Sequence, residues 1–178
     1  MKTLRFPALL LAAAALTAGA DACIKALTLD EMVAKTDAAV VGEVTSVRSV
    51  KSHVEGHGDF IYTLVTVEGE DLYSGETRSI ETAFVGGTYE GESMLVTSMP
   101  SPSEYRIGNE VVVFSAPVED WHPEVGRSLY AAMGGIFRVH NGVVFGKGEG
   151  FAVEGNQRVE LLRENIQAAL VAKRGGKQ

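Results

Sequence analysis

Polar and apolar positions follow two different periods along this chain, and the helical period comes first. Thr28 and Glu31 have the spacing of a capping box, in which a hydroxyl and a carboxylate satisfy free amides at the start of a helix. The apolar residues that follow fall on one helical face. This pattern predicts a short amphipathic helix over residues 29–35.

From residue 38 onward the period changes to two, which predicts strands. The segment 38–47 is rich in β-branched residues. Gly42 lies in its middle, where a glycine permits a bulge or a sharp bend. A Gly-rich stretch, HVEGHGDF, predicts a loop. The next strands are read from three apolar runs: FIYTLVTVEG, RSIETAFVGG and EVVVFSA.

Loop signals dominate residues 86–109, where one short strand is predicted near residues 94–97. They return in an irregular segment, residues 117–127. Because binding residues concentrate on loops that a rigid scaffold positions, these two loop regions are the expected contact surfaces.

A two-residue hairpin is predicted at Asn141 and Gly142, which supply the two positive-φ positions of such a turn between apolar runs. The period of two around it places Phe137, Val139 and Val144 toward the interior. The neighbouring polar residues then face solvent.

The chain ends with a helical pattern over residues 157–173, for which Asn156 is the expected N-cap. One apolar stripe runs along this helix: Val159, Leu162, Ile166, Ala169 and Leu170. Gly175 and Gly176 follow it, as is typical after a helix end.

Together these elements predict a mainly β fold of one domain, residues 23–178. A short helix, at least five bent strands and a closing helix favour a small OB-like β-barrel, because a tightly closed sheet must coil strongly. A two-sheet β-sandwich is the alternative.

The first residues have the pattern of an export signal. Lys2 and Arg5 give a positive start, residues 9–16 form an apolar run, and small residues precede a cleavage site after Ala22. The run is too short to span a bilayer, and no later stretch is long and apolar enough to do so. We therefore expect residues 1–22 to be a signal peptide and the protein to be periplasmic or secreted.

Cys23, the only cysteine, would then be the first residue of the mature chain. A lipoprotein signal also ends at a cysteine, so a membrane-anchored lipoprotein attached through Cys23 remains an alternative. A single cysteine cannot form an internal disulfide. It can stay free, pair with another molecule or carry lipid.

The charge balance is acidic and excludes some partners. Removing residues 1–22 takes away two basic residues and one acidic residue, so the formal charge moves from −7 to −8. Nucleic acids require a basic face, and anionic membranes attract one as well. The expected partner is a protein or another envelope component, with no nucleic acid.

Several segments resemble a widespread group of secreted bacterial proteins of uncharacterised activity, over about residues 27–140. The segments are LDEMVAKTDAAVVGEVTSV, YTLVTVEGEDLYSGE, RIGNEVVVF and GGIFRV. More distantly, the layout is similar to the OB-fold domain of tissue inhibitors of metalloproteinases. Those inhibitors begin with a cysteine whose amine and carbonyl chelate a protease's zinc, which implies such a role for Cys23. Their C-x-C pattern and disulfides are missing here.

Two sets of residues are candidates for a site. His53, His57 and Asp59 share one Gly-rich loop, and imidazoles with a carboxylate can bind zinc or copper. Four ligands are usual for a structural metal, so an ordinary polar hairpin loop is favoured over a metal site. Trp121 and His122 form the second set, since exposed tryptophan anchors interfaces. The alternative is a tryptophan that folds over the end of the barrel, with Pro123 stiffening the loop.

Tyr89 and Tyr105, in the first loop region, complete the expected binding surface. Motifs for catalysis are missing: no G-x-S-x-G elbow surrounds a serine, and no histidine adjoins Cys23. The sequence therefore predicts an exported, non-catalytic binding module without a cofactor. The alternative is a metal-dependent hydrolase that uses His53 and His57.

Overall fold

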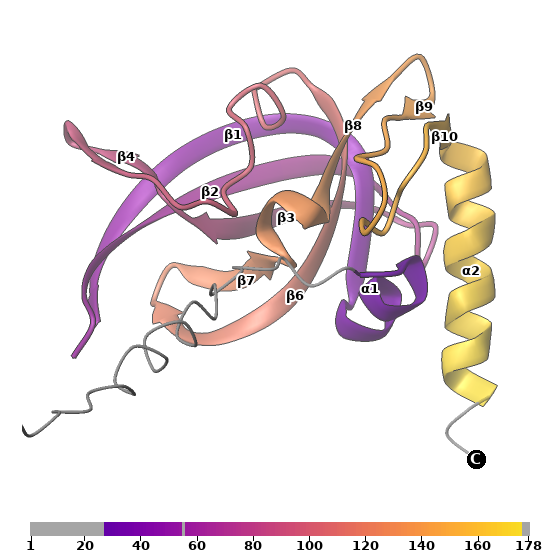
Figure 1. The fold of residues 1–178 in the computed structure, drawn as a ribbon, viewed down its shortest axis with the longest axis horizontal. Helices are drawn as coiled ribbons and strands as arrows, with labels where there is room; N and C mark the ends of the chain where they lie inside the picture. The colour runs from indigo at the N-terminus through magenta and orange to yellow at the C-terminus, as the bar shows by residue number, and fades with distance from the viewer. Residues whose placement is uncertain (1–26, 55, 176–178) are drawn as a thin grey trace, which may run out of the picture.

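The computed structural model describes residues 27–54 and 56–175, and these form a closed five-stranded β-barrel with one helix before it and one after it (Figure 1). The fold is mainly β, as predicted, and the OB-like barrel is confirmed. The sandwich alternative is wrong, because the sheet closes on itself. None of the helices in the described residues has the length and apolar content needed to cross a membrane.

The elements run as follows along the chain. They are α1 (Leu29–Lys35), β1 (Ala38–Val54), β2 (Gly58–Asp71), β3 (Thr77–Val85), β4 (Gly87–Tyr89), β5 (Glu92–Met94), β6 (Glu110–His122), β7 (Val125–Leu129), the 3-10 helix η1 (Ala132–Gly135), β8 (Ile136–His140), β9 (Val143–Val144), β10 (Gln157–Arg158) and α2 (Val159–Gly175). Helix α1 has the predicted bounds. Its capping box is also confirmed, with the Glu31 amide donating to Thr28 Oγ1 at 3.2 Å.

The barrel strands follow the order β1-β2-β3-β7-β6, and β6 pairs back with β1 to close the ring. The first part of β1 pairs with β2 on one side and with β6 on the other, which closes the ring. Val40, for example, pairs with Asp71 of β2 and with Val113 of β6. All barrel pairings are antiparallel except that of β3 with β7. This parallel pairing consists of one residue pair, Ala83 with Ser128. The β3–β7 ladder is therefore the shortest in the ring, and we call this contact between the two strands the β3–β7 seam.

Gly42 occupies the part of β1 where both neighbours pair, directly opposite Gly69 of β2. A Cβ at Gly42 would lie 2.1 Å from the carbonyl oxygen of Glu68, so no larger residue fits without moving backbone. The sequence allowed a bulge or a sharp bend at this glycine, and the register shift of β1 against β2 lies nearby, between Val44 and Ser46. Gly42 thus allows two strands to approach closely.

Two apolar clusters lie on opposite sides of β6, whose residues alternate between them. Val111 and Val113 point into the barrel, while Val112 and Phe114 point outward beneath the helices. The interior cluster comprises Ala38, Val40, Val44, Val65, Val67, Ile80, Phe84, Val111, Val113, Leu129 and Ile136. This double burial explains why the EVVVF segment is apolar at successive positions.

Helix α2 lies beside α1 at one end of the molecule (Figure 1) and is tied to the barrel by polar contacts. Arg163 forms a bidentate pair with Glu70 of β2. Gln167 donates to the carbonyl oxygen of Leu72 at 2.6 Å, and Lys173 donates to that of Val33 at 3.1 Å. These bonds fix both helices against the same wall.

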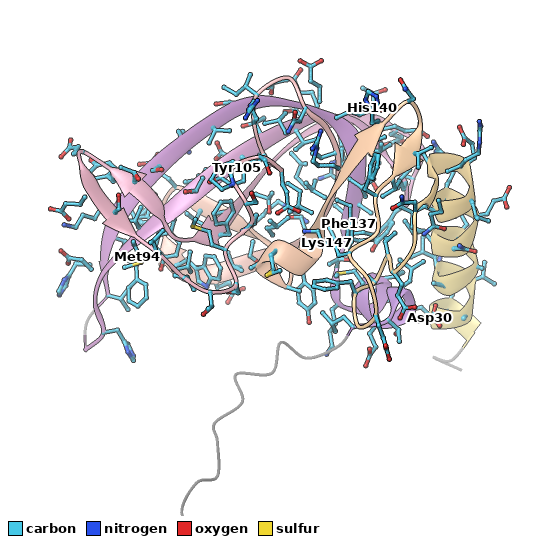
Figure 2. All side chains as sticks on the ribbon, turned by 45° about the horizontal axis from the view of Figure 1, so that its top comes forward. Asp30, Met94, Tyr105, Phe137, His140 and Lys147 are labelled. Atoms are coloured by element: carbon cyan, nitrogen blue, oxygen red, sulfur yellow. The ribbon has the colours of Figure 1, made fainter. Side chains whose placement is uncertain are left out.

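The long loop before β6 is also anchored. Lys147 forms an ion pair with Glu104, and both side chains are mostly buried. The Lys147 ammonium lies over the ring of Phe137, 5.4 Å from its centroid (Figure 2). The ion pair joins the loop that contains Glu104 to the loop that contains Lys147, and each charge neutralises the other.

The predicted hairpin at Asn141 and Gly142 is confirmed, with φ angles of 51° and 72°. Phe137, Val139 and Val144 are buried as expected. Local chemistry determines this turn, because few residues other than asparagine and glycine tolerate two successive positive φ angles.

Three boundaries differ from the sequence prediction. The loop expected in HVEGHGDF is short, because β1 continues to Val54 and β2 begins at Gly58. Residues 117–127 are mostly strand: β6 extends to His122 and pairs with β7, with a register shift between Pro117 and His122. The short strand expected near residues 94–97 lies two residues earlier, as β5, which forms a hairpin with β4. In each case a cross-strand partner extends or replaces the predicted element.

The C-terminal helix also begins later than residue 157. Gln157 and Arg158 pair with Val144 and Val143, so the helix starts at Val159 and continues to Gly175 rather than ending at residue 173. Asn156 does not have the predicted capping contact. Its Oδ1 accepts from the Gly146 amide at 3.0 Å, which holds the preceding loop.

Candidate functional site

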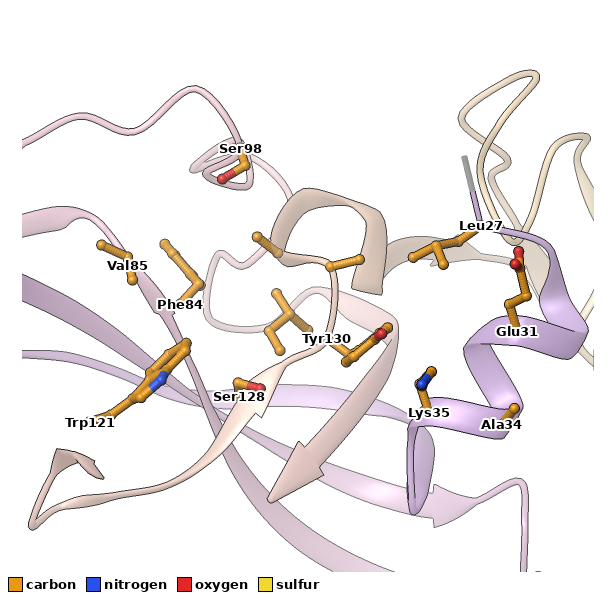
Figure 3. Close-up of a pocket in the computed structure, with 13 residues that line it drawn as sticks. Leu27, Glu31, Ala34, Lys35, Phe84, Val85, Ser98, Trp121, Ser128 and Tyr130 are labelled. Atoms are coloured by element: carbon orange, nitrogen blue, oxygen red, sulfur yellow. The ribbon is translucent and has the colours of Figure 1, made fainter. Parts of the chain in front are cut away.

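A pocket of about 630 Å³ lies beside the β3–β7 seam (Figure 3). The two strands pair at Ala83 and Ser128, and the residues that follow this pair on both strands line the pocket. The wall is completed by α1, the end of β6 and the segment before η1. Its lining residues are Leu27, Glu31, Ala34, Lys35, Phe84, Val85, Ser98, Trp121, Ser128, Leu129, Tyr130, Ala131 and Ala132.

Aromatic and aliphatic side chains form most of this surface. Phe84 and Leu129 are buried members of the barrel interior, and Phe84 packs on Tyr105 with 5.2 Å between the ring centroids. Trp121 stands at one end of the pocket (Figure 3) and packs on Tyr62 at 5.4 Å. The pocket is therefore an extension of the core that remains accessible from outside.

Helix α1 forms the opposite end of the pocket (Figure 3). Met32 and Val33 are buried in the core, so the opposite face of the helix is left for Glu31, Ala34 and Lys35. The carboxylate of Glu31 also accepts from the amide of the capping residue at 3.0 Å. Lys35 has no ion pair with any residue in the described ranges.

Ser128 is the most enclosed polar group of the pocket, with 7% of its surface exposed. Its carbonyl oxygen lies 3.1 Å from Ser115 Oγ, but its own hydroxyl has no hydrogen bond within the described part of the chain. The same holds for the Trp121 indole N–H and the Tyr130 hydroxyl. No fully enclosed side-chain nitrogen or oxygen of the described residues lacks a partner, so these three groups are accessible from the pocket.

Backbone strain occurs in the same wall. Ala131 and Ala132 have φ angles of 57° and 46°, in the left-handed region that disfavours any residue with a Cβ. Gly135 supports this turn from behind, because a Cβ there would lie 2.0 Å from the Tyr130 carbonyl oxygen. Strained positions of this kind cost about 1–3 kcal/mol each and cluster at functional sites.

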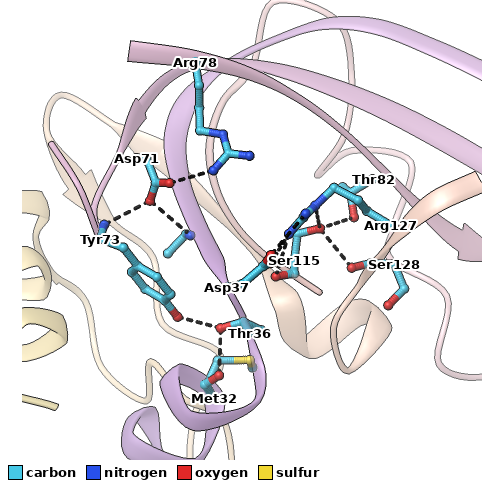
Figure 4. Close-up of polar contacts among 11 residues, drawn as sticks. Met32, Thr36, Asp37, Asp71, Tyr73, Arg78, Thr82, Ser115, Arg127 and Ser128 are labelled. Carbon is cyan, nitrogen blue, oxygen red and sulfur yellow. Dashed lines mark hydrogen bonds and ion pairs between the residues drawn. The ribbon is translucent and has the colours of Figure 1, made fainter. Parts of the chain in front are cut away.

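A polar network holds the seam beneath the pocket (Figure 4). The fully buried Ser115 hydroxyl lies 3.0 Å from Thr82 Oγ1 and accepts from Arg127 Nε at 3.2 Å. The Arg127 guanidinium also pairs with Asp37, directly after α1. These bonds connect β3, β6 and β7 where their ladder is short, and they place Ser128 at the pocket.

A second network lies around Asp71, which is 3% exposed (Figure 4). Its carboxylate accepts from Arg78 and from the Tyr73 amide, both at 2.9 Å. The Tyr73 hydroxyl lies 2.5 Å from Thr36 Oγ1. Burial raises the pKa of Tyr73 to about 12 despite the opposing effect of this hydrogen bond. All these groups have partners, so the cluster serves to join α1 to the barrel.

The predicted binding residues are spread over several places. Trp121 lines the pocket, whereas His122 lines a separate hollow to which Trp121 also contributes. His122 Nδ1 accepts from the Glu124 amide at 3.1 Å. Tyr105 packs against Phe84, and burial raises the pKa of its hydroxyl. Tyr89 lies on β4 and is not part of the pocket lining.

The predicted metal candidates lie on the β1–β2 hairpin. His53 and Asp59 form a cross-strand pair, with 2.7 Å between Nδ1 and Oδ1. This hydrogen bond, with help from Lys51, lowers the pKa of the Asp59 carboxyl. His57 is in the turn between the strands. No group of three or more histidine, cysteine or acidic side chains within the described ranges could hold a metal ion. Cys23 lies outside those ranges.

Sequence reasoning missed Lys35, Ser128, Tyr130 and the two strained alanines. A signal existed only for Lys35, since the predicted helix already leaves that position on its polar face. The others have no periodic pattern or motif, and the pocket forms only when β3 and β7 meet. Comparison with protein-family models, curated proteins and solved structures finds no match to this chain.

Proposed function

We propose that this protein is an exported, non-catalytic binding module and that the apolar pocket at the β3–β7 seam is its ligand site. One observation carries the proposal: a pocket of about 630 Å³, lined mostly by apolar side chains, includes a few polar groups without internal partners. Small-molecule sites in proteins have this size and this composition.

The strain beside the pocket supports the same proposal. Ala131 and Ala132 hold an unfavourable backbone conformation in the pocket wall. A fold maintains such a conformation where the surrounding structure over-determines it, and binding sites are the common location. The rigid barrel on one side and α1 on the other would give a ligand a preformed surface.

Binding without catalysis is favoured by the chemistry of the lining. Ser128 is the enclosed hydroxyl, and no histidine or carboxylate within the described ranges hydrogen-bonds it. A serine nucleophile requires such a base. The described polar groups of the pocket are therefore suited to orient a ligand.

The export part of the proposal rests on the signal-peptide pattern of residues 1–22, which lie outside the described ranges. The acidic charge supports a site for small molecules or proteins over one for nucleic acid. A periplasmic or secreted carrier of an apolar ligand combines these features.

The experiment is a titration of purified residues 23–178 with N-phenyl-1-naphthylamine, an uncharged fluorescent apolar probe. Saturable fluorescence enhancement is expected, with energy transfer from Trp121, the only tryptophan. Ala34→Phe places a large side chain on the pocket-facing side of α1 and should weaken binding about tenfold, as overpacking opposes occupancy.

Ala168→Phe is the matched control, because Ala168 is exposed on α2 and does not line the pocket. It should bind the probe like the wild type. Absence of saturable binding to the wild-type protein, or equal weakening in both variants, would refute the pocket as the ligand site.

A further inference from the structure

The polar groups of the pocket have one chemical property in common, and this property defines a ligand class. The ammonium of Lys35 and the indole N–H of Trp121 can only donate hydrogen bonds. The hydroxyls of Ser128 and Tyr130 can donate as well. A ligand that satisfies them must offer acceptor oxygens.

These donors are distributed along the pocket. Figure 3 shows Trp121 at one end, Lys35 at the other, and Ser128 and Tyr130 between them, with the Tyr130 hydroxyl on the side that faces Lys35. Leu129 and Phe84 supply apolar surface between the two ends. The arrangement fits an elongated apolar molecule with its polar group near α1.

The positive charge of Lys35 favours a negatively charged acceptor group on the ligand over a neutral one. Lys35 has no ion pair with a described residue, so none of these residues neutralises its charge. Glu31 is the acidic group on the same wall, but one of its carboxylate oxygens already accepts from the amide and hydroxyl of Thr28 at 3.0 and 3.2 Å. A carboxylate beside Lys35 and Tyr130 would gain charge-assisted hydrogen bonds, which are stronger than those of a neutral oxygen.

We infer that the pocket binds aliphatic monocarboxylates, with the carboxylate between Lys35 and Tyr130 and the hydrocarbon chain extended over Leu129 and Phe84 toward Trp121. This inference rests on the proposed function of the pocket and adds the identity of the head group. Ser128, whose hydroxyl is accessible and has no hydrogen bond to a described residue, lies beside the path of the chain and offers a further donor to an oxygen of the ligand.

The test is displacement of bound N-phenyl-1-naphthylamine near neutral pH by three molecules of equal chain length: dodecanoate, dodecan-1-ol and dodecylammonium. All are used below their critical micelle concentrations. Dodecanoate should displace the probe at a concentration about tenfold lower than the alcohol, because a hydrogen bond to a charged group is worth more than a neutral one. Dodecylammonium should displace it least.

Variants separate the head-group contact from general charge. Lys35→Met keeps a long apolar side chain and should raise the dissociation constant for dodecanoate about tenfold, a larger change than the one it causes in the dissociation constants for the probe and for dodecan-1-ol. Arg174→Met removes one positive charge from the exposed end of α2 and should have no effect. Tyr130→Phe should weaken dodecanoate binding by a smaller factor.

Different results would overturn the carboxylate inference and the proposed apolar site. Equal displacement by acid and alcohol, together with an unchanged Lys35→Met variant, would overturn the carboxylate inference while the apolar site stands. A wild-type protein that binds neither the probe nor any of the three molecules would refute the proposed function itself.

Discussion

Buried polar residues in this protein differ in whether the fold itself satisfies them. Asp71, Thr36 and Ser115 each have hydrogen-bond partners around the base of the barrel. The hydroxyl of Ser128 has none in the described chain, although the residue is almost as enclosed. No fully enclosed side-chain nitrogen or oxygen of the described residues lacks a partner, so the Ser128 hydroxyl is accessible from the open pocket.

Tyr73 makes the free energy of unfolding depend on pH in the alkaline range. Its folded-state pKa of about 12 lies above the ordinary value of 10. The folded protein therefore holds this proton longer than the unfolded chain. The contribution is complete below pH 10 and is lost as the pH rises through about 12.

Chemical denaturation across this range should show a loss of about 2 kcal/mol that Tyr73→Phe abolishes. The variant should lose about 1 kcal/mol at neutral pH, because Thr36 loses a hydrogen-bond partner. Burial also raises the pKa of Tyr62 and Tyr105, so a smaller alkaline slope should remain. An alkaline slope in Tyr73→Phe equal to that of the wild type would contradict this assignment.

Elements with local causes could be predicted from the sequence, and those with remote causes could not. The capping box of α1 and the Asn141–Gly142 turn depend on neighbouring residues, so their patterns were sufficient. Strand β10 depends on β9, and the extension of β6 depends on β7. The prolines at 117 and 123 further concealed that extension, because proline is a loop signal in sequence.

Register in the β8–β9 hairpin can be tested by charge insertion. Val139 is 4% exposed, whereas Arg138 and His140 point to solvent. Val139→Asp would bury an unpaired charge and should cost more than about 3 kcal/mol, while Arg138→Ala should cost about 0.5 kcal/mol or less. Urea denaturation of both variants measures this difference.

If Val139→Asp fails to accumulate, Val139→Ala replaces it, with an expected loss of about 2 kcal/mol from the cavity. His140→Ala serves as a second exposed control. Equal losses at positions 138 and 139 would contradict the inward register.

At the scale of the whole molecule, the barrel could be predicted and the pocket could not. Strand periodicity and the glycine in β1 favoured a closed sheet over a sandwich, and the structure has the closed sheet. The pocket combines α1 with residues near positions 84, 121 and 130, which become neighbours only through the parallel contact of Ala83 with Ser128. Parallel pairings leave no local signature in a mainly antiparallel chain.

The mature chain should begin at Cys23 or Asp21, because small residues precede both positions and follow the apolar run of the leader. Intact-mass measurement of the exported protein would identify the first residue. A mass increment of diacylglycerol size, with extraction that requires detergent, would establish the lipoprotein alternative instead.

The single residue pair that joins β3 to β7 makes this line the natural point of reversible opening. Separating the strands there breaks few ladder hydrogen bonds, so its free-energy cost is lower than that of global unfolding. A ligand bound in the adjacent pocket would contact both strands and would stabilise their pairing. Ligand binding would then raise the free energy needed to separate β3 from β7. The rate of this local opening would in turn set the dissociation rate of the ligand.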